Sequence, residues 1–207
     1  MNKDNRLFFP ATERNKYAIA KVITSFLPKS GAILEIASGS GEHAVFFQEI
    51  FNEITWHTSD PNQKNRESII SWINYKKLQR IMPPPLDLDI SKLPWPIYEK
   101  LKSIIRGIIC INMIHVVPFD YAEKLFSESI NFLSSADPII IYGPFKENGF
   151  HTSESNKLFD LSLKRSNSLW GLRDVEKINN IALKFKYESP IRIKMPSNNL
   201  MLIYKKR

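Results

Sequence analysis

Cysteine is almost absent from this 207-residue sequence, which carries only Cys110. A single cysteine excludes a disulfide framework and a thiolate zinc site, and we expect no metal centre. Long apolar runs are also missing, because the run at 104–117 is interrupted by Arg106 and His115 and is too short to span a bilayer. Residues 1–15 lack the apolar region of a secretory signal. We therefore expect a cytoplasmic protein without membrane attachment.

Basic residues exceed acidic ones, with 29 Lys and Arg against 21 Asp and Glu and a net charge of +8. Such a balance can indicate nucleic-acid binding. The lysines are scattered, however, and the densest basic groups are the short stretches 76–80 and 205–207. The sequence therefore favours a solvated basic surface, with an acidic partner or substrate as the alternative. It gives no indication of the oligomeric state.

Apolar periodicity predicts one domain, 1–207, because no internal repeat or long linker interrupts the chain. Strands and helices are predicted to alternate, which is typical of a parallel sheet with helices on both faces. We expect a Rossmann-like α/β fold whose sheet is seven-stranded and mostly parallel and ends in a C-terminal antiparallel hairpin. The predicted strands are 32–37, 54–59, 86–90, 107–113, 138–142, 187–195 and 199–205, and the predicted helices are 11–27, 42–51, 63–77, 119–133, 153–166 and 174–185.

A glycine turn between the first predicted strand and a helix is the most informative segment. It lies in residues 34–44, Leu-Glu-Ile-Ala-Ser-Gly-Ser-Gly-Glu-His-Ala. Glycines allow a ligand to approach the backbone closely, and the free N–H groups at the start of the helix face that ligand. The spacing from Gly39 to Gly41 and Ala44 also fits a dinucleotide site, so the loop alone leaves the nucleotide open. No P-loop lysine follows, which excludes a P-loop nucleotidase.

Three acidic residues decide between a dinucleotide and S-adenosylmethionine. Glu35 lies inside the first strand, where a carboxylate suits a cationic ligand and repels a pyrophosphate. Asp60 follows the second strand and can accept the ribose hydroxyls of either cofactor, and Asp89 follows the third and can accept the adenine amine, which suits the methyl donor. The carboxyl edge of an open sheet is where ligands bind. We therefore expect S-adenosylmethionine as the cofactor and S-adenosylhomocysteine as its product.

The stretch from Leu34 to Gly41 resembles the first motif of class I S-adenosylmethionine-dependent methyltransferases, with Ala37 in place of the usual first glycine. Asp60 resembles the acidic residue of the second motif, and Asp89 with the following Leu-Pro-Trp resembles the third. The wider pattern is similar to the methyltransferase-like protein twenty-six family and its bacterial relatives. The matching stretches are 10–16, 34–44, 94–96, 111–115, 142–145, 151–152, 170–174 and 195–200.

This resemblance implies the methyltransferase fold and the cofactor, and it leaves the acceptor open. Asn112 and the residues after it resemble the fourth motif, at the end of the fourth strand. The cofactor-binding residues that follow from the residues and the resemblance together are Glu35, Ala37, Ser38, Gly39, Gly41, Asp60, Asp89 and Asn112.

Methyl transfer is an in-line displacement, so the acceptor has to be aligned and, where it carries a proton, deprotonated. His115 after the fourth strand and His151 after the fifth are the candidate catalytic residues, with a structural role as the alternative for each. Residues 144–174 are the predicted lid or acceptor insertion.

An N-terminal arm and helix, 1–30, can close over the cofactor and exclude water. The candidate substrate-binding residues are Arg14, Asn15, His43 and Asn156. The sequence thus predicts a methyltransferase acting on a small-molecule acceptor. The alternatives are a non-catalytic S-adenosylmethionine-binding or interaction protein and a methyltransferase of protein or nucleic acid.

Overall fold

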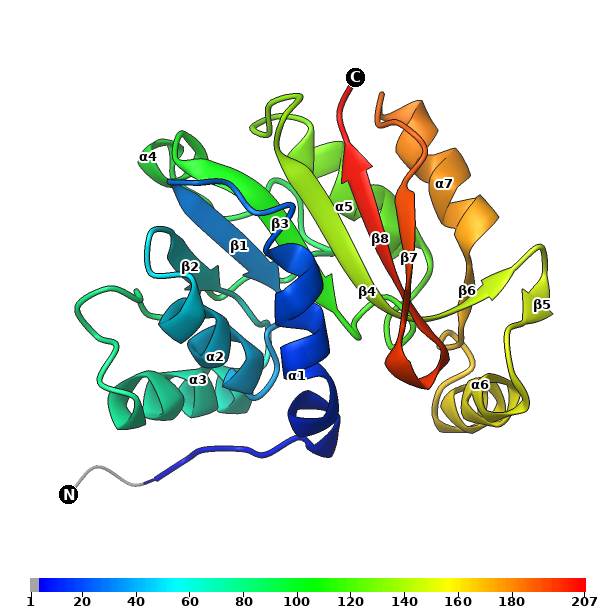
Figure 1. The fold of residues 1–207 in the computed structure, drawn as a ribbon, viewed down its shortest axis with the longest axis horizontal. Coiled ribbons are helices and arrows are strands. Elements are labelled where there is room, and N and C mark those ends of the chain that lie inside the picture. Colours follow the sequence, from blue (N-terminus) through cyan, green and yellow to red (C-terminus); the bar gives the residue numbers. More distant parts are fainter. Residues whose placement is uncertain (1–3) are drawn as a thin grey trace. The chain divides into compact units, whose positions relative to one another are not determined.

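Helices and strands alternate along most of the chain in the computed structural model, which describes residues 4–207 (Figure 1). The chain forms two compact units, Met1–Ile109 and Cys110–Arg207, hereafter the N-terminal and the C-terminal unit. The boundary between them falls within one strand, β3 (Ile105–Ile111). Within residues 4–207, no helix has the length and apolar character needed to cross a bilayer.

The N-terminal unit contains a parallel sheet in the order β2-β1-β3. The first two strands pair from Ala32 opposite Thr55 to Glu35 opposite Thr58. All five residues of β1 are buried, as expected for a parallel strand covered on both faces. The elements of this unit that precede β3 are α1 (Pro10–Ile23), β1 (Ala32–Ile36), α2 (Glu42–Ile50), β2 (Thr55–Thr58), α3 (Gln63–Tyr75) and α4 (Glu99–Lys102).

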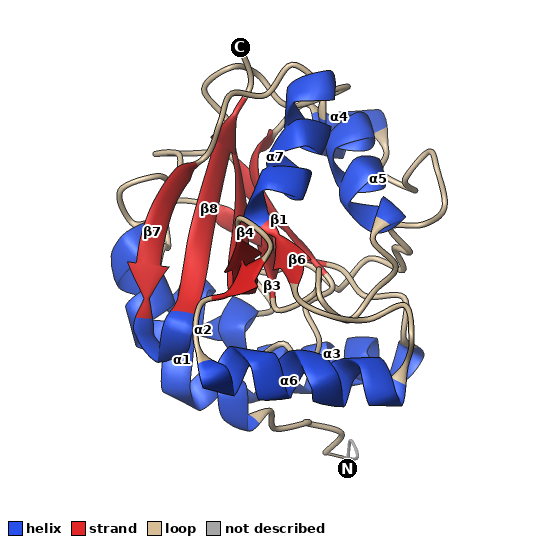
Figure 2. Cartoon of the chain, turned by 90° about the vertical axis from the view of Figure 1, so that its right-hand side faces the viewer, coloured by secondary structure: helices blue, strands red, loops and turns tan. Residues whose placement is uncertain are grey.

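The C-terminal unit is built around a long strand, β4 (Pro138–Glu147), which pairs antiparallel with β8 (Asn199–Lys205). Phe126, on α5, packs against Tyr204 of β8 with ring centroids 5.0 Å apart. Helices α5 and α7 lie on the same face of these strands (Figure 2). The remaining elements of this unit are α5 (Asp120–Ser129), β5 (Phe150–His151), α6 (Glu154–Ser166), β6 (Arg173–Asp174), α7 (Val175–Lys184), β7 (Ile191–Met195) and the short 3-10 turn Pro196–Asn198.

The predicted fold class is confirmed: the protein has a mostly parallel α/β sheet with a C-terminal antiparallel hairpin, β7–β8. Within residues 4–207 the sheet has eight strands, not seven, because β5 and β6 pair with the end of β4. The strand predicted at 86–90 is reduced to a single bridge between Ser59 and Leu86. The prolines at 83–85 have no backbone N–H to donate, so strand pairing cannot extend through the residues that precede Leu86.

Candidate functional site

The loop between β1 and α2 has alternating left-handed residues. The backbone φ is +55° at Ala37, +58° at Gly39 and +89° at Gly41. A Cβ at Gly41 would lie 2.8 Å from the Ile69 side chain, so both the conformation and the space require glycine there. Ala37 holds the same kind of conformation with its Cβ in place, which is the position where the methyltransferase motif usually has glycine.

Most amides at the start of this loop already have partners. Ser38 N donates to Ser59 O at 2.8 Å, and Gly41 N donates to Ser38 O at 3.1 Å. Gly39 N donates to the Asp60 carboxylate, with N and Oδ2 3.0 Å apart. A pyrophosphate needs a row of free backbone N–H groups. This loop directs its amides to the protein itself and places a carboxylate beside them.

Two carboxylates give the loop a negative environment. Asp60 is buried, and its Oδ1 accepts hydrogen bonds from Asn62 N at 2.9 Å and from Asn65 Nδ2 at 3.1 Å. Burial raises the pKa of Asp60, and these hydrogen bonds act in the opposite direction. Glu42 Oε2, in the first turn of α2, accepts a hydrogen bond from Ser40 Oγ at 2.8 Å. The charge beside the loop suits a cation better than an anion.

Glu35 lies at the end of β1 and is only 1% exposed. Trp56 Nε1 donates to its Oε2 at 2.8 Å. Burial raises the pKa of Glu35 to about 8, against smaller lowering effects of hydrogen bonds from Trp56 and Ser38. A pKa of about 8 favours the protonated form of Glu35 at neutral pH, and the carboxyl that contacts the loop amide of Gly39 is Asp60.

The segment after residue 85 brings Asp89 to the same end of the sheet as Asp60. Asp60 N donates to Leu86 O at 3.1 Å, which holds the segment beside the end of β2. Asp89 is half-buried, and its Oδ1 accepts a hydrogen bond from Ser91 N at 2.9 Å. Among residues 4–207, no three His, Cys, Asp or Glu side chains are grouped so as to hold a metal ion.

The N-terminal strap, residues 5–10, crosses the glycine loop and α3. Leu7 N donates to Ser68 Oγ at 2.8 Å, and Phe9 N donates to Glu42 Oε2 at 2.7 Å. A Cβ atom built at Gly39 would lie 3.0 Å from the Phe9 ring, so this ring lies next to the glycine. The strap therefore covers the loop.

Two of the three substrate-binding candidates in the N-terminal unit contact each other, and the third is exposed. His43 Nε2 lies 2.7 Å from Asn15 Oδ1, so the imidazole donates to the amide oxygen and links α2 to α1. Burial, with a smaller effect of Lys16, lowers the pKa of His43 to about 4 and keeps the ring neutral. Arg14 is exposed on α1. His43 and Asn15 are thus brought together.

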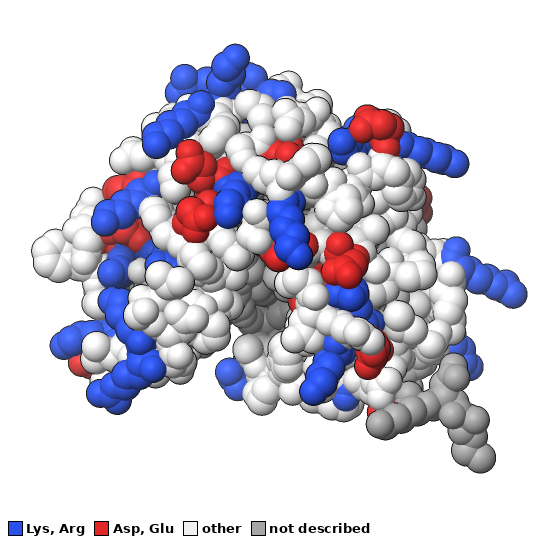
Figure 3. Space-filling view, turned by 180° about the vertical axis from the view of Figure 1, so that it is seen from behind, with Lys and Arg blue, Asp and Glu red and all other residues white. Residues whose placement is uncertain are grey.

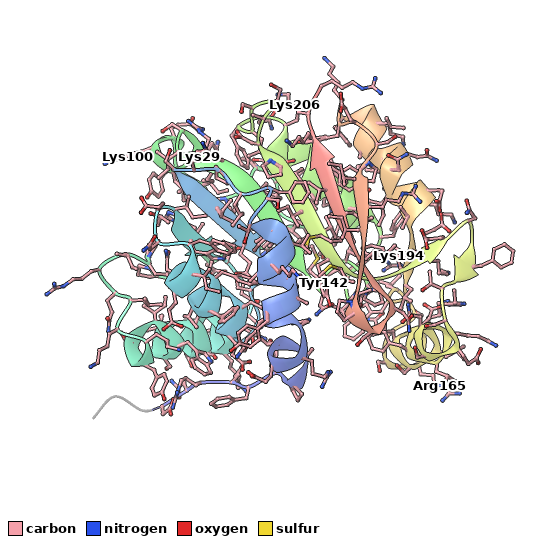
Figure 4. All side chains as sticks on the ribbon, in the orientation of Figure 1. Lys29, Lys100, Tyr142, Arg165, Lys194 and Lys206 are labelled. Atoms are coloured by element: carbon pink, nitrogen blue, oxygen red, sulfur yellow. The ribbon has the colours of Figure 1, made fainter. Side chains whose placement is uncertain are left out.

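In the C-terminal unit, Asn112 and His115 follow β3. Asn112 N donates to the backbone oxygen of Tyr142, a residue labelled on β4 in Figure 4. His115 is 3% exposed, and its buried Nδ1 has no hydrogen-bond partner among residues 4–207. A Cβ at Gly143 would lie 3.3 Å from this nitrogen. Burial, helped by the charge of Arg173, lowers the pKa of His115 to about 4.

His151 lies next to Asp160 of α6. Its Nε2 is 2.9 Å from Asp160 Oδ2, and Lys164 Nζ is 2.7 Å from the same oxygen. Burial would raise the pKa of Asp160, but hydrogen bonds from Lys164, His151 and Leu172 N lower it to about 2. Asp160 is therefore an ionised anchor that orients His151.

Asn156 is buried on α6, one turn before Asp160. Its Nδ2 donates to Thr152 Oγ1 and to Asn198 O, each at 2.9 Å. The Asn156 amide therefore ties α6 to the turn between β7 and β8.

Sequence reasoning missed Glu42, Ser68 and the strap contact of Phe9. Glu42 is visible in the sequence as the acid after Gly41, at the first helical position. Ser68 donates to Ser40 O at 2.7 Å and so links α3 to the loop. No local pattern marks Ser68, because its partners are distant in sequence.

The mixed sheet, the glycine turn after its first strand and the acid after the second define a Rossmann-like fold of the methyltransferase type. The chain belongs to a family described as "Protein of unknown function (DUF938)", whose model matches residues 6–206.

Solved structures share this fold. An O-methyltransferase family 2 protein from Planctomyces limnophilus, in complex with apigenin, has a TM-score of 0.75 at 12% identity, covering 95% of this chain and 60% of that one. Human N-acetylserotonin methyltransferase, in complex with S-adenosylmethionine, has a TM-score of 0.70 at 10% identity, covering 95% and 52%. The pyocyanin biosynthetic protein PhzM has a TM-score of 0.74 at 12% identity, covering 95% and 56%. The chain thus spans little more than half the length of these proteins.

Proposed function

We propose that this protein is an S-adenosylmethionine-dependent methyltransferase acting on a small-molecule acceptor, similar to the methyltransferase-like protein twenty-six family. The observation that carries the proposal is the glycine loop whose Gly39 amide is held by the Asp60 carboxylate. The amides of Ser38, Gly39 and Gly41 are bonded within the protein, so the loop offers a pyrophosphate few free N–H groups. The names of the structural neighbours agree, since one was solved with S-adenosylmethionine and another with a small phenolic molecule.

The residues of the N-terminal unit have separate proposed tasks at the donor. Asp60 accepts the ribose hydroxyls and Asp89 the adenine amine, while Ala37, Ser38, Gly39 and Gly41 allow close approach of the backbone. When bound, S-adenosylmethionine supplies a methyl group on a cationic sulfur. Phe9 and the rest of the strap exclude water from the loop that it covers.

Each unit contributes residues with proposed acceptor functions. His151, oriented by Asp160, can take a proton from the acceptor through its other ring nitrogen. His115 is the second candidate for proton handling or acceptor positioning, and Asn112 is proposed to bind the methionine end of the donor. In the N-terminal unit, Arg14, Asn15 and His43 are proposed substrate-binding residues; in the C-terminal unit, Asn156 is another, and residues 144–174 are the proposed lid or acceptor insertion. The proposed setting is cytoplasmic, without a membrane or nucleic-acid partner.

The test is isothermal titration of the full chain with S-adenosylmethionine, S-adenosylhomocysteine and NAD. We expect both sulfur compounds to bind and NAD to give no heat. Asp60→Asn removes the charge at the ribose and should weaken binding about 10- to 100-fold, which corresponds to about 1.4–2.8 kcal/mol. Asp87→Asn is the matched control, because Asp87 is an exposed carboxylate that pairs with Arg66.

Binding of NAD without binding of either sulfur compound would overturn the proposal. Catalysis needs a second readout, the release of S-adenosylhomocysteine from the donor in the presence of a metabolite extract. Donor binding with no such release would instead favour a non-catalytic binding protein.

A further inference from the structure

A basic pocket of about 210 Å³ lies within the C-terminal unit, on residues to which the proposed function assigns no charge-binding role. Its lining includes Lys146 from β4, Lys177 from α7, Arg173 from β6 and Lys164 from α6. The one carboxylate that lines it is Asp174. Four cations thus surround a small space beside a single acid.

The Asp174 carboxylate is already engaged. Asp174 is 8% exposed, and its Oδ2 accepts a hydrogen bond from Gly149 N. Lys164 is also engaged, through Asp160. Lys146 and Lys177, in contrast, have no ion-pair partner among residues 4–207. These two ammonium groups leave an uncompensated positive charge at the pocket.

Arg173 is fixed in place by backbone oxygens. Its Nε donates to Ile114 O at 3.0 Å, and its Nη2 donates to Leu169 O at 2.7 Å and to Val117 O. These acceptors hold the guanidinium without neutralising its charge. Nη1 has no partner within the part of the chain that the structure describes, so its two N–H groups remain for a ligand. A charged guanidinium nitrogen with unpaired N–H groups can donate to an oxyanion.

The remaining lining limits the size and shape of a ligand. Phe119 has the Arg173 guanidinium over its ring, 5.6 Å from the centroid. Phe119 and Leu172 add an apolar side to the pocket. This volume takes a phosphate group together with a small ring, but no polymer.

We propose that this pocket binds a small phosphate monoester through Lys146, Lys177 and Nη1 of Arg173, with its organic group against Phe119. A phosphate monoester carries nearly two negative charges at neutral pH and three acceptor oxygens, which suits three cations that share the pocket with one carboxylate, Asp174. A carboxylate offers one charge and two oxygens. The site lies within one unit, so its binding is measurable without a methyl donor.

The experiment is a titration of the full chain with phenyl phosphate, inorganic phosphate and benzoate, followed by amide NMR. We expect phenyl phosphate to bind tighter than benzoate, with shifts gathered at residues 119, 146 and 171–177. The double variant Lys146→Gln with Lys177→Gln should weaken phenyl phosphate at least tenfold. The control is Lys157→Gln with Lys184→Gln, which removes the same charge at exposed sites outside the pocket and should change binding less than twofold.

Neither double variant touches Arg173, whose backbone contacts support the fold. Equal weakening in both double variants would show general charge attraction and overturn the site. Benzoate binding as tightly as phenyl phosphate would overturn the phosphate assignment. Failure of S-adenosylmethionine binding would leave these titrations unaffected, so the two proposals fail separately.

Discussion

Ala37 is the residue at which this chain departs from the usual methyltransferase loop. Its φ of +55° lies in the left-handed region, where a Cβ contacts the following carbonyl oxygen at a cost of about 1–2 kcal/mol. Glycine removes this contact but loses more conformational entropy on folding, about 0.5–1 kcal/mol relative to alanine. The difference favours glycine at position 37.

We therefore predict that Ala37→Gly stabilises the protein by about 0.5–1 kcal/mol. The matched control is Ala44→Gly, because Ala44 lies buried in the helical part of α2. There the same change should destabilise by about 1 kcal/mol. Urea unfolding measures both. If Ala37→Gly destabilised the protein as much as Ala44→Gly does, the left-handed conformation would not be the cause of strain at position 37.

At the scale of elements, α3 connects the N-terminal strap to the glycine loop. Ser68, fully buried on α3, accepts from Leu7 N at 2.8 Å and donates to Ser40 O at 2.7 Å. Trp72 Nε1 donates to Leu7 O at 3.0 Å, and the Arg6 guanidinium stacks over Tyr75 at 3.7 Å. One face of α3 therefore holds the strap. The hydroxyl group of Ser68 contacts both the strap and the glycine loop.

Ser68→Ala should leave both partners unpaired and destabilise this region by about 1–3 kcal/mol. We predict faster hydrogen exchange at the Leu7 amide and weaker binding of the methyl donor, since the strap covers the loop. Ser71→Ala is the control, because within residues 4–207 Ser71 accepts a single hydrogen bond, from Asn5 N at 3.3 Å. Unchanged exchange at Leu7 in Ser68→Ala would contradict the proposed link.

Elements with strong apolar periodicity were predictable from the sequence, and elements without it were not. The predicted helix 63–77 corresponds to α3, Gln63–Tyr75, and the predicted strand 199–205 corresponds to β8. The predicted helix 11–27 ends early, at Ile23, because the chain then turns through 24–27. Strands β5 and β6 have two residues each, too few for any periodicity.

The glycine loop was accessible to sequence reasoning because strand, turn and helix follow one another within 34–44. The protonation of Glu35 was not, since it depends on burial by side chains distant in sequence. The pocket around Lys146 and Lys177 was missed for the same reason. Its lining comes from separate segments between 119 and 177, and single lysines in each segment resemble ordinary surface residues.

At the scale of the whole molecule, the net charge of +8 is spread out. Lys and Arg side chains on the face shown in Figure 3 are dispersed and mixed with Asp and Glu. On this face no continuous basic band of the kind that tracks a nucleic-acid backbone is present among the described residues.

Buried titratable groups with opposite effects determine how the stability of the molecule depends on pH. The pKa of Glu35 is raised from 4.5 to about 8, so its contribution is greatest below pH 4.5 and is lost as pH rises towards 8. The pKa of His43 and of His115 is lowered from 6.5 to about 4. Their contribution is complete above pH 6.5 and is lost as pH falls towards 4.

We therefore predict a stability maximum near pH 6.5. Each group changes the free energy of unfolding by about 1.4 kcal/mol per pH unit in its own range. Between pH 4.5 and 6.5 the two histidines outweigh Glu35, so stability rises with pH. Above pH 6.5 Glu35 acts alone and stability falls. Urea unfolding from pH 5 to 8.5 measures both limbs.

Glu35→Gln separates the two limbs, because glutamine keeps an oxygen that accepts from Trp56 Nε1 and has no proton to lose. In this variant the stability should no longer fall between pH 6.5 and 8, whereas its rise between pH 4.5 and 6.5 should remain. Glu53→Gln, at an exposed site, is the control and should follow the wild-type profile. A wild-type stability that stays level from pH 6.5 to 8, or a decline that persists in Glu35→Gln, would show that Glu35 is ionised in the folded protein.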